Sequence, residues 1–124
     1  MDPFSKYVFD YDRMCRQVVT VYHEEGGQVT RTVHRRAFLD FKRTENVEKI
    51  GNDEASSFLL VVPGDKPACR TGDKVLLGVG PQVPEDATKW WRTFIPSKVD
   101  NLVVVRWVDP KFWRGRMVHT EAGG

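Results

Sequence analysis

The run Phe58-Leu59-Leu60-Val61-Val62 is the longest uninterrupted apolar stretch in the chain, and Pro63-Gly64 follows it directly. A short apolar run that ends at turn-forming residues is typical of a strand buried on both faces. Residues 102–108 (LVVVRWV) show the same β-branched and aromatic composition, and Asp109-Pro110 is expected to end that strand. These two segments predict a core built on β-strands.

A hairpin is predicted ahead of the first of these strands. Residues 16–22 (RQVVTVY) favour a strand, and residues 23–27 (HEEGG) end in two glycines that can adopt the positive φ of a tight turn. The return strand is expected at 28–40, where polar residues occupy both alternating faces as far as Ala37. We expect this hairpin to project from the body or to lie against a partner, because neither face is cleanly apolar.

Three shorter segments complete the pattern. Residues 74–77 and 116–120 are expected strands, and residues 84–94 are expected to form one or two helical turns. We therefore predict an all-β fold, namely a small single-domain β-barrel or sandwich of about six short strands with a long inserted loop and at most one short helix. Residues 1–14 would form an N-terminal arm, and residues 15–124 a single β-barrel domain with the inserted loop at 41–57.

The composition agrees with one folded domain. The 124 residues include 7 Phe, 4 Trp and 3 Tyr, which is too aromatic for a disordered chain. The formal net charge is only +2, and no apolar run approaches the ~20 residues that cross a bilayer. The N-terminal residues lack the order of a secretory signal, and Cys15 and Cys69 stand far apart, so we expect reduced thiols and no membrane contact.

Residues 41–57 interrupt the strand pattern. Seven of these 17 residues are charged, and Val47 and Ile50 are their only aliphatic residues larger than alanine. Loops of this length are uncommon inside compact domains and are frequently functional. The residues that we assign to a functional loop are Lys42, Arg43, Thr44, Glu45, Asn46, Val47, Glu48, Lys49, Ile50, Gly51, Asn52, Asp53 and Glu54.

No arrangement of residues predicts catalysis. The three histidines lack the spacing of a metal site, and no serine lies in a Gly-x-Ser-x-Gly elbow. Arg70 could lower the pKa of Cys69, but no sequence feature brings a histidine to that thiol. Gly78-x-Gly80 lacks the third glycine of a dinucleotide-binding loop. We therefore expect no enzymatic activity, no metal and no cofactor.

Residues 111–116 combine cations with aromatic rings. In a β-barrel, such a mixture can stack the bases of a single strand and contact its phosphates. The alternative is that Phe112 and Trp113 are buried against the barrel edge while the cations are solvated. The candidates for contact with nucleic acid are Lys111, Trp113, Arg114 and Arg116.

A further set of residues is assigned to contacts between subunits. Aromatic residues alternate with charges in the arm, which either packs on its own barrel or reaches a neighbour. Trp90 and Trp91 are adjacent, so one ring can cover a barrel end while the other meets a partner. The predicted interface residues are Phe4, Tyr7, Phe9, Tyr11, Arg31, Arg35, Trp90 and Trp91.

The second half of the chain also carries an ordered series of motifs. These are FLLVVPG at 58–64, GDKVLLGVGP at 72–81, FIPSKV at 94–99, VVVRWVDPKFW at 103–113 and HTEAGG at 119–124. Over residues 20–124 the chain resembles a family of small structural proteins of tailed bacteriophages, the minor capsid or head-tail connector proteins. Its layout is similar to the head-closure (stopper) class.

The resemblance implies a small β-barrel that assembles into a ring, six-fold in the stopper class, beneath the portal and adaptor. Residues 42–54 would be a channel-gating loop, and their nearly balanced charge would let them block DNA sterically without binding it tightly. The implied partners are other copies of the chain, the phage adaptor/portal complex, tail-completion or tail-tube proteins and the packaged double-stranded DNA. The implied location is the neck of the virion, after synthesis in the host bacterial cytoplasm.

Two other functions stay open at this point. Within the virion, the chain could be a tail-terminator ring protein. Outside that class, it could be a single-stranded nucleic-acid-binding β-barrel that uses residues 111–116.

Overall fold

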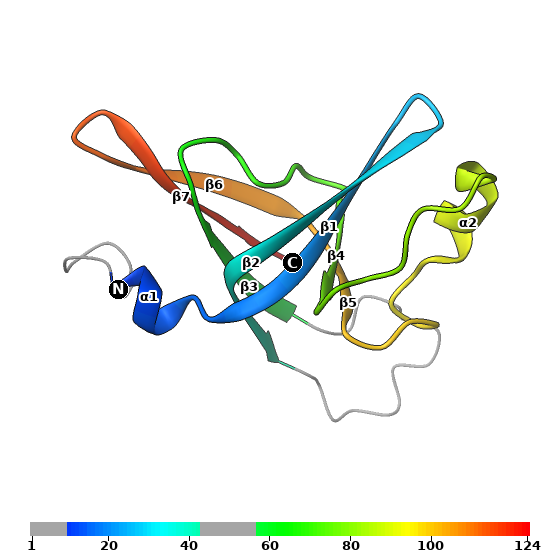
Figure 1. The fold of residues 1–124 in the computed structure, drawn as a ribbon, viewed down its shortest axis with the longest axis horizontal. Coiled ribbons are helices and arrows are strands. Elements are labelled where there is room, and N and C mark those ends of the chain that lie inside the picture. The colour runs from blue at the N-terminus through cyan, green and yellow to red at the C-terminus, as the bar shows by residue number, and fades with distance from the viewer. Residues whose placement is uncertain (1–9, 43–56) are drawn as a thin grey trace.

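A computed structural model describes residues 10–42 and 57–124 of the chain. The elements, in order, are α1 (Tyr11–Met14), β1 (Gln17–Glu25), β2 (Gln28–Lys42), β3 (Ser57–Pro63), β4 (Lys74–Leu77), α2 (Ala87–Thr93), β5 (Leu102–Val104), β6 (Trp107–Trp113) and β7 (Arg116–Gly123). The prediction of an all-β fold is confirmed (Figure 1).

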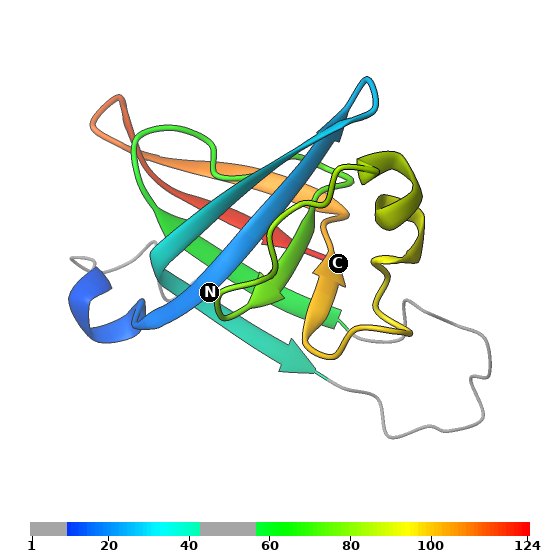
Figure 2. The ribbon, with the colours of Figure 1, turned by 45° about the vertical axis from the view of Figure 1, so that its right-hand side comes forward.

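All of these strands lie in one antiparallel sheet, in the order β5-β4-β1-β2-β3-β7-β6. The 15-residue β2 is shared by the two halves of the sheet, because it pairs with β1 as far as Ala37 and with β3 from Phe38 onward. A bulge in the β1–β2 ladder, between Gln17 and Val19, accompanies this change of partner. The strands cross one another at a steep angle in Figure 2, as expected of a strongly twisted sheet.

The two edges of the sheet meet at a corner formed by Val105 and Arg106, which directly connect β5 to β6. Val105 N donates to Asp73 O at 2.9 Å, and Val105 O accepts from Gly72 N at 2.8 Å. Arg106 N donates to Gly123 O at 2.8 Å, so this corner is hydrogen-bonded to both halves. β5 and β6 themselves remain the edge strands, so the sheet is curled but is not a closed barrel.

One hydrophobic core fills the inside of the curled sheet. It takes buried residues from β1, β2, β3, β4, β5 and β7 and from the loop that carries Cys69. Its buried members are Val19, Val21, Ala37, Leu39, Phe58, Leu60, Val62, Cys69, Val75, Val103, Val105 and Ala122. Both halves of the sheet therefore depend on the same packing.

A second apolar cluster lies where α2 covers one end of the sheet. Tyr22, Phe94 and Leu102 are its buried members, and Trp90 stacks on Phe94 at a centroid distance of 4.4 Å. Lys74 of β4 donates from Nζ to Trp91 O at 2.6 Å and lies 4.0 Å from the centre of the Trp91 ring. These contacts anchor a helix that has no fully buried residue of its own.

The prediction of one strand at 102–108 is wrong, and so is its expected end at Asp109-Pro110. The segment divides at the Val105–Arg106 corner, and Pro110 lies inside β6. Proline lacks a backbone N–H, but β6 is an edge strand with one unpaired side, so the proline is tolerated there.

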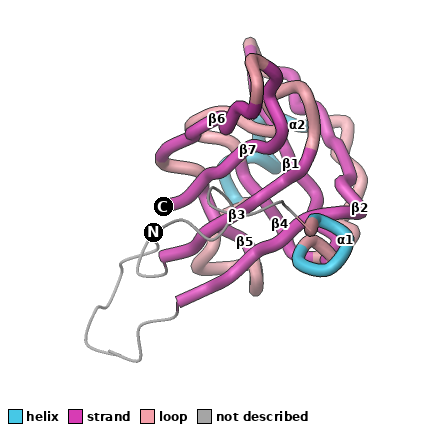
Figure 3. Tube along the Cα trace, turned by 90° about the vertical axis from the view of Figure 1, so that its left-hand side faces the viewer, coloured by secondary structure: helices cyan, strands magenta, loops and turns pink. Residues whose placement is uncertain are grey.

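The prediction of at most one helix is also wrong. Tyr11–Met14 form α1, whose Asp10 side chain accepts from Arg13 N at 3.1 Å. Figure 3 shows α1 outside the strands. Tyr11 Oη lies 2.7 Å from Nδ1 of the fully buried His119, and His119 Nε2 lies 2.9 Å from Glu121 Oε2. Tyr11 is therefore held against β7, whereas Asp12 Oδ1 forms an ion pair with Nη2 of Arg36 in β2 at 2.7 Å.

The inserted loop is shorter than predicted, because β2 and β3 pair as far as Lys42 and Ser57. Phe41, Lys42 and Ser57 belong to strands, which leaves residues 43–56 as the connection. Antiparallel neighbours can be joined by a turn of only ~2–5 residues. The strand pairing itself therefore does not need the length of this connection.

We predict that residues 43–56 can be replaced by a four-residue Gly/Asn turn without loss of the fold. The shorter loop should raise the free energy of unfolding by about 1 kcal/mol, because closing a shorter loop costs less entropy. Chemical denaturation of both proteins, followed by tryptophan fluorescence, measures the difference. A large loss of stability would mean that residues 43–56 contribute to the core.

Candidate functional site

The β6–β7 hairpin extends past the body of the molecule and carries the exposed aromatic residues predicted at 111–116 (Figure 1). Phe112 is 64% exposed and Trp113 is 58% exposed. The alternative that these two rings are buried against the barrel edge is therefore wrong. Large exposed aromatic side chains are a frequent mark of binding surfaces.

The turn of this hairpin consists of Arg114 and Gly115, between the paired residues Trp113 and Arg116. Both turn residues have positive φ, at 53° for Arg114 and 80° for Gly115. A two-residue turn with positive φ at both positions matches the right-handed twist of a hairpin. Glycine adopts this conformation readily, but an arginine does so only with strain.

The cations of the hairpin are arranged differently from one another. Lys111 Nζ forms an ion pair with Asp109 Oδ2 at 2.8 Å. Arg114 lies over the Trp113 ring at 5.7 Å from its centre, within the range of a cation–π contact. Arg114 and Arg116 have no ion pair with any residue in the described part of the chain. Their charges are available at the tip.

The free edge of β6 is poorly suited to pairing with another strand. Pro110 has no backbone N–H, and Asp109 and Lys111 place charges on either side of it. A register shift between Lys111 and Phe112 also distorts the outer half of the strand. Charges, proline and bulges at an edge are features that prevent edge-to-edge association. The hairpin is therefore suited to binding through its side chains.

Trp107, at the other end of β6, is 44% exposed and lies opposite Gly123 of β7. A Cβ at Gly123 would collide with the Trp107 ring and would lie 2.8 Å from Phe58 O. The ring therefore covers the glycine, as aromatic residues do on designed sheets. Trp107 belongs to the outer surface of the sheet and not to its core, although it lies in one of the most apolar segments of the sequence.

Several predicted interface residues are engaged within the chain. Tyr11 contacts His119, and Trp90 and Trp91 pack with the cluster under α2. Arg31 is half-buried and donates from Nε and Nη2 to Gly80 O, at 3.2 and 2.7 Å, whereas Arg35 is exposed. Phe4, Tyr7 and Phe9 lie outside the described residues. The assignment of these eight residues to a subunit interface stays a prediction.

The acceptor of Arg31 belongs to a loop held closely against β1. Gly80 N donates to Thr20 Oγ1 at 2.8 Å, and Thr20 Oγ1 donates to Gly78 O at 2.7 Å. The buried Tyr22 hydroxyl donates to Pro81 O at 2.7 Å, and burial raises the pKa of this phenol. The backbone of the motif Gly78-x-Gly80-Pro81 therefore supplies the hydrogen-bond partners of side chains on β1 and β2.

We predict that Gly80→Ala destabilises the protein by about 1–3 kcal/mol, the usual cost of overpacking a core. The added Cβ would collide with the Tyr22 hydroxyl and would lie 2.9 Å from Leu76 Cδ2. Thermal unfolding measures the change. The control is Val79→Ala, a change at the adjacent, 59% exposed residue, which should be nearly neutral. Equal stability of the two variants would contradict this account of the loop.

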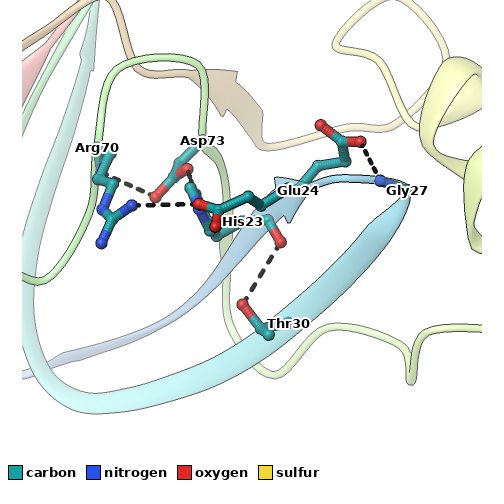
Figure 4. Close-up of polar contacts among 7 residues, drawn as sticks. His23, Glu24, Gly27, Thr30, Arg70 and Asp73 are labelled. Atoms are coloured by element: carbon teal, nitrogen blue, oxygen red, sulfur yellow. Dashed lines mark hydrogen bonds and ion pairs between the residues drawn. The ribbon is translucent and has the colours of Figure 1, made fainter.

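A polar cluster that the sequence analysis missed lies between β1 and the loop before β4 (Figure 4). His23 Nδ1 is 2.5 Å from Asp73 Oδ1, and His23 Nε2 is 3.2 Å from Glu25 Oε1. The Asp73 side chain is only 4% exposed, and its Oδ2 also accepts from Arg70 N at 2.8 Å. Arg70 Nη1 lies 3.4 Å from Glu25 Oε1.

This arrangement favours the protonated imidazole. Both ring nitrogens of His23 face carboxylate oxygens, which is the environment in which both nitrogens donate. The hydrogen bond to Asp73, then that to Glu25, raises the pKa of His23 against the opposing effect of burial. His34 behaves differently, because burial lowers its pKa and its Nε2 has no hydrogen-bond partner among residues 10–42 and 57–124.

The cluster borders a pocket of about 130 Å³ whose wall includes Cys69. Burial, and secondarily the charge of Asp73, raises the pKa of the Cys69 thiol to about 12. The suggestion that Arg70 lowers this pKa is therefore wrong, since the guanidinium is directed to Glu25. Burial likewise raises the pKa of Cys15 to about 11.

We predict that His23 makes the stability of the protein depend on pH. Its pKa is raised on folding, so its contribution is fully present below the unfolded value of about 6.5 and is lost as pH rises through the folded value. The measurement is the free energy of unfolding of the wild type minus that of His23→Gln, from about pH 5.5 to 9. Subtraction is needed because the lowered pKa of His34 acts in the opposite direction. A difference that does not change with pH would contradict this assignment.

Three further predictions concern the channel-gating loop, metal binding and membrane contact. Residues 43–54 of the predicted channel-gating loop lie outside the described residues, and Lys42 is the last residue of β2. Among residues 10–42 and 57–124, no group of three or more His, Cys, Asp or Glu side chains could hold a metal ion. None of the helices in these ranges is long and apolar enough to cross a membrane.

Comparisons of the chain with known proteins found no relative. No family model, no curated protein and no solved structure matches the chain. The function must therefore be argued from the residues, their geometry and the resemblance of the motifs.

Proposed function

We propose that the chain is a structural protein of a tailed-bacteriophage particle, at the head-tail junction. In this proposal, copies of the chain form a head-closure ring between the portal/adaptor complex and the tail-completion or tail-tube proteins. The motifs between residues 58 and 124 carry the resemblance on which this assignment rests. The ring encloses the channel through which packaged double-stranded DNA passes.

The observation that supports the proposal best is the connection between β2 and β3. These strands pair up to Lys42 and Ser57, so the 14 residues at positions 43–56 exceed what joins the two strands. The resemblance implies a long loop between two early strands at this place. Such surplus length in a small domain is frequently functional. The gating role of residues 42–54 stays a prediction of the sequence.

Immunogold labelling of purified tailed particles, viewed by electron microscopy, tests the location. We expect label at the head-tail junction and nowhere else on the particle. The control is the same antibody after adsorption with the purified chain, which should leave the particles unlabelled. Absence of the chain from purified particles would contradict a virion role, and label on the shell or at the tail tip would contradict the junction.

The variant with residues 43–56 replaced by a short turn tests the loop separately. We expect this folded variant to enter particles that lose their packaged DNA, measured as DNA accessible to nuclease. Particles that contain the variant and retain protected DNA would contradict a role of the loop in closing the channel while leaving the location intact.

A further inference from the structure

The tip of the β6–β7 hairpin has an amino acid that its backbone does not favour. Arg114 occupies the first turn position at φ 53°, where asparagine or glycine would be less strained. Residues held in unfavourable backbone conformations accumulate at functional sites, where the side chain is needed. The strain therefore raises the question of which ligand requires a guanidinium at this tip.

The surroundings of Arg114 narrow the chemistry of that ligand. Trp113 and Phe112 are more than half exposed, and they lie immediately before the turn. Arg116 directly follows the turn and is also exposed. Arg114 and Arg116 have no ion pair in the described ranges, and Arg116 lies across the hairpin from Trp113, on the same face. A matching ligand carries negative charge and flat surfaces that can stack.

Single-stranded nucleic acid satisfies both requirements. Its phosphates match the guanidinium groups, and its unpaired bases offer flat faces on which aromatic side chains can stack. A duplex matches the charges only, because its bases are already stacked on one another. An acidic peptide segment likewise supplies charge without a flat surface for each ring.

We propose that the β6–β7 hairpin binds single-stranded nucleic acid, with a base stacked on Trp113 and phosphates contacted by Arg114 and Arg116. Contacts to the phosphate backbone make binding weaken as the salt concentration increases. This activity does not depend on the ring or on the location proposed above.

The test is fluorescence anisotropy of a labelled 12-residue oligo-dT with the full chain, at several salt concentrations. Trp113→Leu keeps an apolar side chain but removes the flat ring, and it should weaken binding about tenfold. Arg114→Asn suits the turn better than arginine, so it should preserve or raise the melting temperature while weakening binding. It should also reduce the slope of log K against log salt by about 0.7, the value for one phosphate contact on a single strand.

Two controls separate this proposal from its alternatives. Arg92→Asn makes the same change of charge at an exposed position on α2, and it should leave binding unchanged. A 12-base-pair duplex and a 12-residue poly-glutamate peptide should bind or compete at least tenfold more weakly than oligo-dT. Three results would each overturn the proposal. These are equal binding of the duplex, equal competition by the peptide, and no binding of oligo-dT at about 50 mM salt.

Discussion

The structure depends on the corner at which Val105 and Arg106 carry the chain from β5 to β6. Hydrogen bonds join this corner to Gly72 and Asp73 on one side and to Gly123 on the other. On the opposite side of the sheet, the long β2 belongs to both halves. The two halves are thereby tied at both sides around one core, although the edge strands never pair. A cooperative body of this kind can carry projecting segments that contribute little to its stability.

The packed sheet and the segments at the ends of its strands have different roles in the molecule. The Gly80 loop, Lys74 and the Tyr11–His119 contact all attach peripheral segments to the sheet. The β6–β7 tip and the connection at 43–56 lie at ends of paired strands, where the ladder is complete without them. At the β6–β7 tip the aromatic and cationic side chains are exposed, so they can serve recognition.

The sequence predicted the strands best where both faces are buried, as at Phe58–Val62, because burial on both sides needs a continuous apolar run. It failed at 102–113, since the corner at Val105 is set by hydrogen bonds to residues more than thirty positions earlier. Pro110 was misread for a related reason, because its tolerance depends on β6 being an edge strand. Edge position follows from topology and not from local composition.

The sequence predicted which residues make up the candidate site, but not whether their side chains are exposed. Residues 111–116 were identifiable because cations and aromatic rings occur together there, whereas only the structure shows that Phe112 and Trp113 project into solvent. The His23–Asp73 pair could not be found, since its members lie 50 positions apart in no recognisable motif. Arg31 was assigned to an interface because its strand is polar on both faces, and that assignment stays a prediction. Its bond to the Gly80 carbonyl could not be predicted, since a backbone acceptor has no side-chain signature.

Native-state hydrogen exchange at the corner is the most direct test of this account. The amides of Gly72, Val105 and Arg106 should exchange only through global unfolding, with the same free energy as the amide of Leu60 in the interior strand β3. The tip amide of Gly115 should exchange through local opening at a much lower free energy. Corner amides that exchange as easily as Gly115 would show that the two halves open independently and would contradict the account.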